Sequence, residues 1–301
     1  MAKIGVIEFG YHQPEESAMQ VVQNVIDYTV LADKLGFSRM WFTEHHDFFK
    51  TSPWSNPEIL LPLFLGMTKK IKIGIAGILI NYHSPYNVAL NFKLLANLFP
   101  GRVDLGFANG TPPDNPSMFI RQKKFKKKPD EFEKKIKFIS DLYLKEEEMG
   151  LKYSITIPPV AGEVPNMFLL GSYFKRTQMA LNLKLSYSKS LFHDAGARVN
   201  EKENVDRFKE AFYEKYGELP FINIAVPIIC AKNKTQAKKI ESRSGHPPLP
   251  NTLSGSMNYI EDEIYTLLNL FGIEEIILLD KSLDHRIKLE TLHKIKERFI
   301  K

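Results

Sequence analysis

The sequence predicts an α/β protein folded as a single (β/α)8 TIM barrel, and three observations support this fold class. Short strand-like runs alternate with longer helical runs along the chain instead of forming separate blocks. The strand-like runs number eight within 301 residues, which is the number that this barrel requires. The run 71–80 lacks regular polar alternation, as expected of a strand covered on both faces of a parallel sheet.

The strands and helices are expected in alternating order. The predicted strands are 3–9, 39–43, 71–80, 103–107, 167–170, 185–191, 222–231 and 275–279. The predicted helices are 17–35, 57–67, 87–98, 130–144, 173–183, 201–216, 235–243, 259–270 and 283–299. Gly36 and Gly217 stand where helix C-caps are expected, and Asn56 is an N-cap signal before the second helix.

A doubly wound open sheet is the alternative, because strand number alone does not close a barrel. Residues 8–14, after the first strand, contain no Gly-x-Gly-x-x-Gly pattern, so no Rossmann dinucleotide site is expected there. Two irregular segments interrupt the alternation: 111–129 is rich in proline and lysine, and 244–256 is rich in proline and glycine. Long loops of this kind often act as lids. We therefore expect one domain over residues 1–301 with lids at these two segments.

The composition excludes several classes of protein. Cys230 is the single cysteine, which rules out a disulfide framework and cysteine-built metal sites. The chain reaches the polar residues Glu8 and His12 too early for the apolar core of a signal peptide. No apolar run approaches the roughly 20 residues of a membrane span. We expect a cytoplasmic protein that does not associate with membranes.

The net charge of +6 is concentrated in the segment 121–137, where Arg121 and several lysines lie close together. The end of this segment mixes lysines with acidic residues, and only Phe119 and Phe125 are aromatic residues nearby. A nucleic-acid site would interleave basic and aromatic side chains. We therefore interpret the segment as a solvated loop and charged helix, and expect no nucleic-acid partner. Whether this basic segment attracts an anionic small molecule is left open by the sequence.

In a (β/α)8 barrel the active site is assembled at the carboxyl ends of the strands. The densest group of titratable side chains there is Glu44-His45-His46, after the second strand. Imidazole beside carboxylate suits general acid–base catalysis or metal binding. Adjacent side chains of an extended segment point to opposite sides, so the two histidines cannot both reach one ion without a bend. We expect no metal, assign proton transfer to His45, and expect His46 to make a structural hydrogen bond.

A second candidate site follows the fifth strand. Gly171 and Ser172 are expected to open the next helix, with Lys175 and Arg176 in its first turn. Backbone N–H groups, a hydroxyl and nearby cations can bind an anion or a phosphate, although serine is also a common N-cap. Basic residues in a first turn are unfavourable to the helix dipole, and this favours the phosphate interpretation.

Several motifs resemble those of the bacterial luciferase-like flavin monooxygenases. The sequence Glu44-His45-His46 after an aromatic-rich strand is a fairly specific signature of that family. The stretches that resemble the family's second to fifth strands are 31–46, 73–79 with 83–85, 99–110 and, more loosely, 168–172. The similarity covers residues 3–112 well and 165–192 plausibly.

The resemblance implies a barrel, usually dimeric, that binds reduced FMN from a separate flavin reductase and oxidises a small organic substrate with O2 through a peroxyflavin. It implies that His45 assists proton movement. It also implies that the flavin ring rests on a bulge at Ala76-Gly77, often with a non-proline cis peptide. The residues expected around the cofactor are Glu44, Ala76, Gly77, Asn109, Gly110, Gly171, Ser172, Lys175, Arg176 and Ser190.

Three positions depart from the luciferases proper. Asn109 replaces an arginine near the flavin phosphate, Gly171 replaces a glutamate, and Ala108 replaces a cysteine that is reactive in some luciferases. We therefore expect no thiol chemistry and no light emission from an aldehyde. The alternatives are a deazaflavin-dependent oxidoreductase that transfers hydride, a non-catalytic flavin-binding homologue and, more distantly, a metal-dependent hydrolase.

Overall fold

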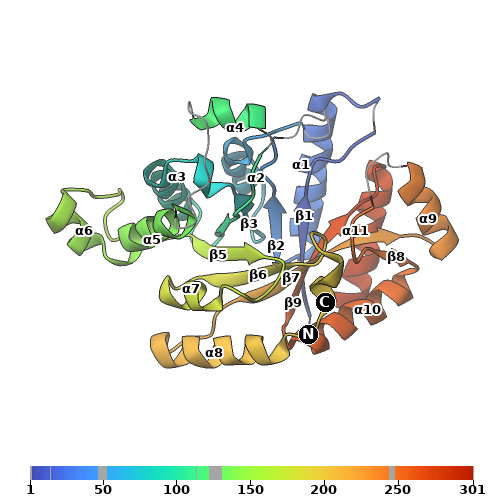
Figure 1. The fold of residues 1–301 in the computed structure, drawn as a ribbon. Coiled ribbons are helices and arrows are strands. Elements are labelled where there is room, and N and C mark those ends of the chain that lie inside the picture. The colour runs from blue at the N-terminus through green and yellow to red at the C-terminus, as the bar shows by residue number, and fades with distance from the viewer. Residues whose placement is uncertain are drawn as a thin grey trace.

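Eight parallel strands close into a barrel in the computed structural model of the chain, which describes residues 2–13, 15–46, 53–112, 114–121, 131–243 and 248–300 (Figure 1). The barrel strands are β1 (Lys3–Glu8), β2 (Arg39–Phe42), β3 (Lys72–Ile78), β4 (Val103–Phe107), β5 (Asn166–Gly171), β6 (Ser186–Ser190), β7 (Ile222–Cys230) and β9 (Glu275–Asp280). Strand β9 pairs with both β1 and β7, and β6 also pairs with β7, so the sheet returns on itself. The barrel is therefore confirmed, and the open sheet is wrong.

One additional strand lies in a segment that we expected to be irregular. Strand β8 (Leu253–Gly255) pairs in parallel with the last three residues of β7, Ile228 to Cys230. The expectation of an irregular stretch over 244–256 is wrong for this part. Three residues are too few to show a period in the sequence, so only the tertiary pairing reveals this strand.

Helices cover the outside of the barrel in Figure 1. The α-helices are α1 (Ala18–Leu35), α2 (Leu61–Met67), α3 (Pro85–Leu98), α4 (Asp114–Arg121), α5 (Glu131–Leu144), α6 (Glu146–Tyr153), α7 (Thr177–Asn182), α8 (Lys202–Tyr216), α9 (Lys234–Arg243), α10 (Met257–Phe271) and α11 (His285–Phe299). The 3-10 helices are η1 (Pro57–Ile59), η2 (Ile80–Tyr82) and η3 (Ala195–Arg198). The predicted caps are confirmed: Gly36 ends α1 with φ of 87°, and Gly217 ends α8 with φ of 71°.

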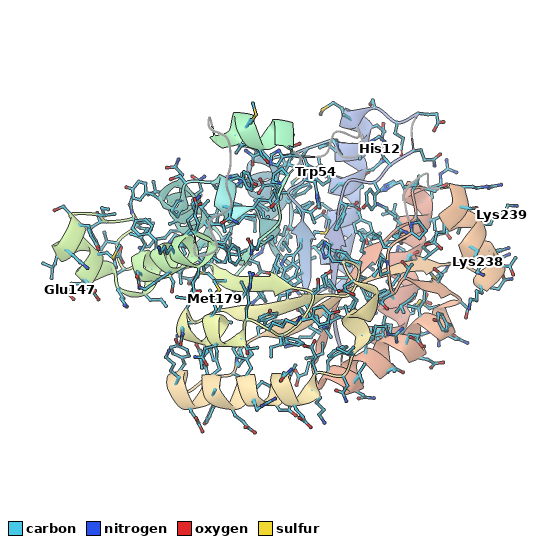
Figure 2. All side chains as sticks on the ribbon, viewed as in Figure 1. His12, Trp54, Glu147, Met179, Lys238 and Lys239 are labelled. Atoms are coloured by element: carbon cyan, nitrogen blue, oxygen red, sulfur yellow. The ribbon has the colours of Figure 1, made fainter. Side chains whose placement is uncertain are left out.

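The predicted helix 57–67 is divided into η1 and α2. Asn56 caps the first piece, because its side-chain oxygen accepts a hydrogen bond from the Glu58 N–H at 3.2 Å. Pro62 falls in the first turn of α2, where it has no N–H to donate to the preceding turn. Trp54, labelled in Figure 2, lies just before this segment and packs edge-to-face on Phe42 of β2 at 6.0 Å.

Two helices were not predicted from the sequence. Helix α4 occupies part of the segment 111–129 that we expected to be irregular, and residues 122–129 lie outside the described part of the chain. Helix α6 projects beyond α3 and α5 (Figure 1). Lys93 of α3 holds it there, because the buried Lys93 Nζ donates to Glu146 at 2.7 Å and to the Ile157 carbonyl at 2.9 Å.

The amino-terminal half of the barrel interior is filled by a buried ion-pair cluster. Arg39 of β2 donates to Asp104 of β4 at 2.5 Å and to Glu275 of β9 at 3.0 Å. The indole N–H of Trp41 also donates to Asp104, at 2.9 Å. The Arg39 guanidinium lies 4.5 Å from the centre of the Phe221 ring. These groups close the floor of the barrel, and the space above them is left for a ligand.

The outer surface carries charges of both signs. Figure 2 shows Lys238 and Lys239 pointing outward from α9, and Glu147 pointing outward from α6 at the opposite side of the molecule. Within the described residues, no helix combines the length and apolar character needed to cross a bilayer.

Candidate active site

A cavity of about 300 Å³ opens at the carboxyl ends of the strands. Its lining is mostly apolar, with Phe9, Trp41, Leu170 and Phe192 among its larger side chains. Cavities of this size and character are typical of small-molecule sites. Of the residues predicted from the sequence, the lining includes His45, Glu44, Ala76, Gly77, Asn109, Gly110, Gly171, Ser172 and Ser190.

Strand β3 bulges where it borders the cavity. The peptide bond between Ala76 and Gly77 is cis, and the register with β4 shifts between Ile75 and Ile78. Both features were expected from the family resemblance and are confirmed. A glycine suits this close approach, since a Cβ at position 77 would lie 2.9 Å from the Gly106 carbonyl oxygen and 2.3 Å from Leu170 Cδ1. The bulge therefore presents bare backbone to one wall of the cavity.

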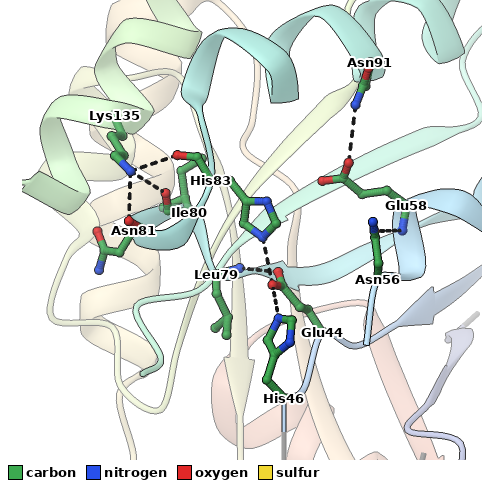
Figure 3. Close-up of polar contacts among 10 residues, drawn as sticks. All are labelled: Glu44, His46, Asn56, Glu58, Leu79, Ile80, Asn81, His83, Asn91 and Lys135. Carbon is green, nitrogen blue, oxygen red and sulfur yellow. Dashed lines mark hydrogen bonds and ion pairs between the residues drawn. The ribbon is translucent and has the colours of Figure 1, made fainter. Parts of the chain in front are cut away.

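The Glu44 carboxylate connects the ends of β2 and β3 (Figure 3). Its Oε1 accepts hydrogen bonds from His46 Nε2 and His83 Nε2, both at 2.8 Å. Its Oε2 accepts from the Leu79 N–H at 2.8 Å. Lys135 of α5 stabilises the segment that follows β3, because its Nζ donates to three carbonyls of residues 80–83. These contacts fix the backbone on both sides of His45.

The contacts of Glu44 determine its charge and that of His83. Burial alone would raise the pKa of Glu44, but the hydrogen bonds from His46 and His83 outweigh burial and lower the pKa to about 2. Burial alone would lower the pKa of His83, but its hydrogen bond to Glu44 and the negative charges of Glu44 and Glu58 raise it. Glu44 is therefore a carboxylate at neutral pH, and it favours a protonated His83.

His45 and His46 point in opposite directions, as predicted for neighbours on an extended segment. His45 lines the cavity and packs against Phe9, with ring centres 5.1 Å apart. His46 is bonded to Glu44 outside the cavity lining, so its predicted structural hydrogen bond is confirmed. Of this pair, His45 therefore borders the cavity and His46 does not.

The predicted helix N-terminus at Gly171 and Ser172 is wrong. Helix α7 begins at Thr177, because the Ser172 carbonyl accepts from Lys189 Nζ at 2.7 Å and the next carbonyl accepts from the Tyr187 hydroxyl at 2.8 Å. Lys175 and Arg176 stack on rings: Lys175 lies 4.7 Å from the centre of Tyr173, and Arg176 lies 5.2 Å from that of Phe132. Neither cation lines the cavity.

The polar lining also contains residues that sequence reasoning missed. Thr43, Ser188 and His193 line the cavity. The Thr43 hydroxyl is buried and has no hydrogen-bond partner within the described residues. Ser188 lies within β6, two residues before its end, and alternates with Ser190 on the inner face. His193 lies three residues after the end of β6, beyond the predicted strand 185–191.

The described lining is poor in formal charge. It contains no lysine or arginine side chain among the described residues. In that same part of the chain, no three His, Cys, Asp or Glu side chains are grouped to hold a metal ion. The site therefore offers two imidazoles, the Glu44 carboxylate, hydroxyls, an amide and bare backbone to a ligand.

Comparison with known proteins agrees with this geometry. The sequence profile of luciferase-like monooxygenases matches residues 2–239. The protein YwcH of Bacillus subtilis is 23% identical over 99% of both chains, and the N-acetyl-S-alkylcysteine monooxygenase of the same organism is 25% identical over 79% of this chain and 71% of its own.

Solved structures share the whole fold. Apo-MsnO8 superposes with a TM-score of 0.84 at 22% identity, covering 99% of this chain and 98% of its own. The oxygenating constituent of the 3,6-diketocamphane monooxygenase of Pseudomonas putida, solved with FMN, gives 0.74 at 18% identity, covering 99% and 97%. An F420-dependent secondary alcohol dehydrogenase gives 0.70 at 15% identity, covering 100% and 99%. The chain belongs to the luciferase-like monooxygenase family, whose members are flavin-type oxidoreductases.

Proposed function

We propose that the protein is a cytoplasmic monooxygenase that uses reduced FMN and O2 to oxidise a small organic substrate. The observation that carries this proposal is the placement of His45 in an apolar cavity, facing the space beside the backbone bulge at Ala76-Gly77. A proton-transferring imidazole in a site that excludes water suits oxygen chemistry, because water would otherwise compete at the reacting atoms.

The residues present fit a flavin. Ala76 and Gly77 would support the ring, since the bulge that they form lines the cavity. Thr43 has a buried hydroxyl available for a polar atom of the ligand. Ser172 and Asn109 would hold the phosphate end by neutral hydrogen bonds. The FMN complex of the diketocamphane monooxygenase constituent shows that this fold accommodates FMN in that protein.

Reduced FMN, when bound, supplies two electrons for the reduction of O2. The residues of the chain position the ligand, exclude water from the cavity and supply protons. Phe9, Trp41 and Phe192 exclude water from the reacting atoms. His45 holds a proton at the cavity wall, and the bonded pair of Glu44 and His46 fixes its backbone.

A deazaflavin-dependent hydride transfer is the second candidate. The similarity to the F420-dependent alcohol dehydrogenase over nearly all of both chains favours it. The two candidates differ in the fate of oxygen, because hydride transfer needs none. Substrate turnover that continues under argon with a reduced or oxidised deazaflavin would therefore select the second candidate.

The test is an anaerobic titration with photoreduced FMN, followed by rapid mixing with oxygenated buffer while flavin absorbance is recorded. We expect binding, followed by a transient absorbance distinct from those of oxidised and reduced flavin. His45→Ala should retain binding and lose turnover, about 10²-fold or more. Full activity of His45→Ala would overturn its role. Tight binding without any reaction, even with candidate substrates present, would instead identify a non-catalytic flavin-binding protein.

We propose two partners, a separate flavin reductase that supplies reduced FMN and a second copy of this chain. The support for the homodimer is an apolar surface formed by α2 and α3. Leu63 and Met67 of α2 are 43% and 47% exposed, and Leu94 and Leu98 of α3 are 54% and 61% exposed. Exposed apolar side chains that form one contiguous patch often mark an interface.

Light scattering during gel filtration tests the homodimer. We expect a dimer for the native chain and a monomer for Leu94→Asp/Leu98→Asp. Leu219→Asp is the matched control, because Leu219 is 65% exposed but lies after α8. A native monomer, or equal dissociation by the control, would contradict the proposed interface.

A further inference from the structure

The turn after β6 brings a second imidazole to the mouth of the cavity. Ser188 and Ser190 of β6 point inward and line the cavity, whereas Lys189 between them points outward to Glu201 at 2.5 Å. His193 completes the lining three residues later, and its outer side is exposed to solvent. This histidine therefore lies between bulk water and the cavity interior.

Hydrogen bonds on both sides hold this turn in place. The Leu191 N–H donates to the Ala225 carbonyl of β7 at 2.9 Å. Asn251 Nδ2 donates to the carbonyls of Leu191, at 2.7 Å, and of Asp194, at 3.1 Å. The Asp194 carboxylate accepts from the Gly196 N–H at 2.7 Å. A side chain carried by such a fixed backbone is positioned before any ligand binds.

The ring of His193 contacts Ser190 and an aromatic pair. Its Nδ1 lies 2.7 Å from Ser190 Oγ. Its ring centre lies 4.6 Å from that of Phe192, which in turn meets Phe9 edge-to-face at 5.6 Å. Phe9 also packs on His45. The two imidazoles thus border one cavity, and the Phe9–Phe192 pair lies between them.

The surroundings favour the neutral form of His193. Loss of hydration against the neighbouring rings lowers its pKa, and the positive charge of His45 lowers it further. The nearby carboxylates do not reverse this effect: Asp194 accepts from Gly196, and Glu44 is engaged by two other histidines. A neutral imidazole has one donor nitrogen and one acceptor nitrogen, which is what proton transfer through a ring requires.

We propose that His193 and Ser190 form a proton relay between bulk water and the cavity interior, on the side facing His45. Water protonates Nε2, Nδ1 gives its proton to Ser190 Oγ, and the Ser190 hydroxyl passes its own proton to an acceptor in the cavity. The inference rests on the proposed function, in which substrate, O2, the reduced FMN anion and one proton give the oxygenated substrate, oxidised FMN and water. The relay supplies that proton from solvent.

The first test uses the ligand-free protein. NMR titration of 15N-labelled histidines should give His193 a pKa below the ordinary 6.5, and His45→Gln should raise it. Ser190→Ala should change the tautomer of His193, because Nδ1 loses its partner, whereas Ser190→Thr keeps the hydroxyl and should preserve the tautomer. A His193 that titrates normally in all four proteins overturns the proposal.

The second test measures the reoxidation of photoreduced FMN in weakly buffered, oxygenated solution. At saturating FMN, His193→Gln should slow the proton-dependent step about 10²-fold, and added imidazole should restore the rate. His293→Gln, an exposed histidine on α11, should behave as the native chain. An unchanged rate in His193→Gln, or slowing that imidazole does not relieve, contradicts the relay. Failure of the native protein to bind reduced FMN contradicts the proposed function instead, and the NMR titration then tests only the bonded pair of His193 and Ser190.

Discussion

At the residue scale, Glu44 shows how one carboxylate can organise a catalytic loop. It receives three hydrogen bonds from groups on two different strand ends. The pKa of Glu44 is lowered to about 2 and that of His83 is raised, so the bonded form is an ion pair over a broad pH range. The loop that carries His45 is consequently stabilised by an interaction whose strength depends on pH.

The pH dependence of this pair can be predicted with its sign. The Glu44 contribution is fully present above its unfolded pKa near 4.5 and is lost as pH falls toward 2. The His83 contribution is fully present below its unfolded pKa near 6.5 and is lost as pH rises through the higher folded value. We therefore expect His83→Gln to reduce the free energy of unfolding by about 1.5–3 kcal/mol at pH 5.5, and by less at pH 9.

Urea unfolding of the native chain and His83→Gln at both pH values checks this prediction. His293→Gln, which removes an exposed imidazole from α11, serves as the control for the loss of a histidine. An equal loss of stability at pH 5.5 and pH 9 would show that the ion pair with Glu44 does not contribute.

At the scale of a single element, the bulge of β3 depends on the missing side chain of Gly77. A Cβ at this position would lie 2.3 Å from Leu170 Cδ1 of β5 and 2.9 Å from the Gly106 carbonyl of β4. Three strands therefore meet here more closely than any other residue would allow.

Replacement of this glycine should affect both stability and binding. We expect Gly77→Ala to lower the free energy of unfolding by about 1–3 kcal/mol, since the new methyl group overpacks the contact. FMN affinity should fall as well, because the methyl group displaces the wall. Gly66→Ala is the matched control: nothing lies within 4 Å of its Cβ position on α2, so the change should be neutral or slightly stabilising. Isothermal titration and urea unfolding of both variants measure these effects, and equal behaviour would contradict the prediction.

At the scale of the whole molecule, the Arg39 cluster joins strands from distant parts of the sequence. Arg39 bridges Asp104 and Glu275, so that β2, β4 and β9 are tied across the barrel interior. Burial alone would lower the pKa of Arg39, but the two carboxylates raise it. Arg39 therefore keeps its charge in the barrel interior, and buried ion pairs close this end of the barrel instead of apolar packing alone.

Removal of the Arg39 charge should be costly because two buried carboxylates would lose their partner. We expect Arg39→Met to lower the free energy of unfolding by about 3–5 kcal/mol at pH 7. Lys294→Met is the control, since its ion pair with Glu290 is exposed and 4.0 Å long, and should cost about 1 kcal/mol or less. A comparable loss in both variants would contradict a structural role for the cluster.

Sequence patterns predicted the barrel because most of its strands are short apolar runs that alternate with longer amphipathic helices. They also predicted that His45 and His46 diverge, because an extended backbone enforces alternation. The start of α7 could not be predicted, since the tertiary bonds of Lys189 and Tyr187 occupy the carbonyls of the preceding turn. The position of His193 in the cavity lining could not be predicted either. It depends on a turn that is held by hydrogen bonds from Asn251, which is distant in the sequence.

The closed amino-terminal end of the barrel also restricts how ligands enter and leave the cavity. In the described part of the chain, Arg39, Trp41 and Phe168 pack across the lower end, so exchange with solvent takes place at the carboxyl-terminal mouth. A molecule that enters first lies deepest and leaves last. A cavity with a single opening favours an ordered binding mechanism. In this mechanism the cofactor binds before the substrate, and the product dissociates before the oxidised cofactor.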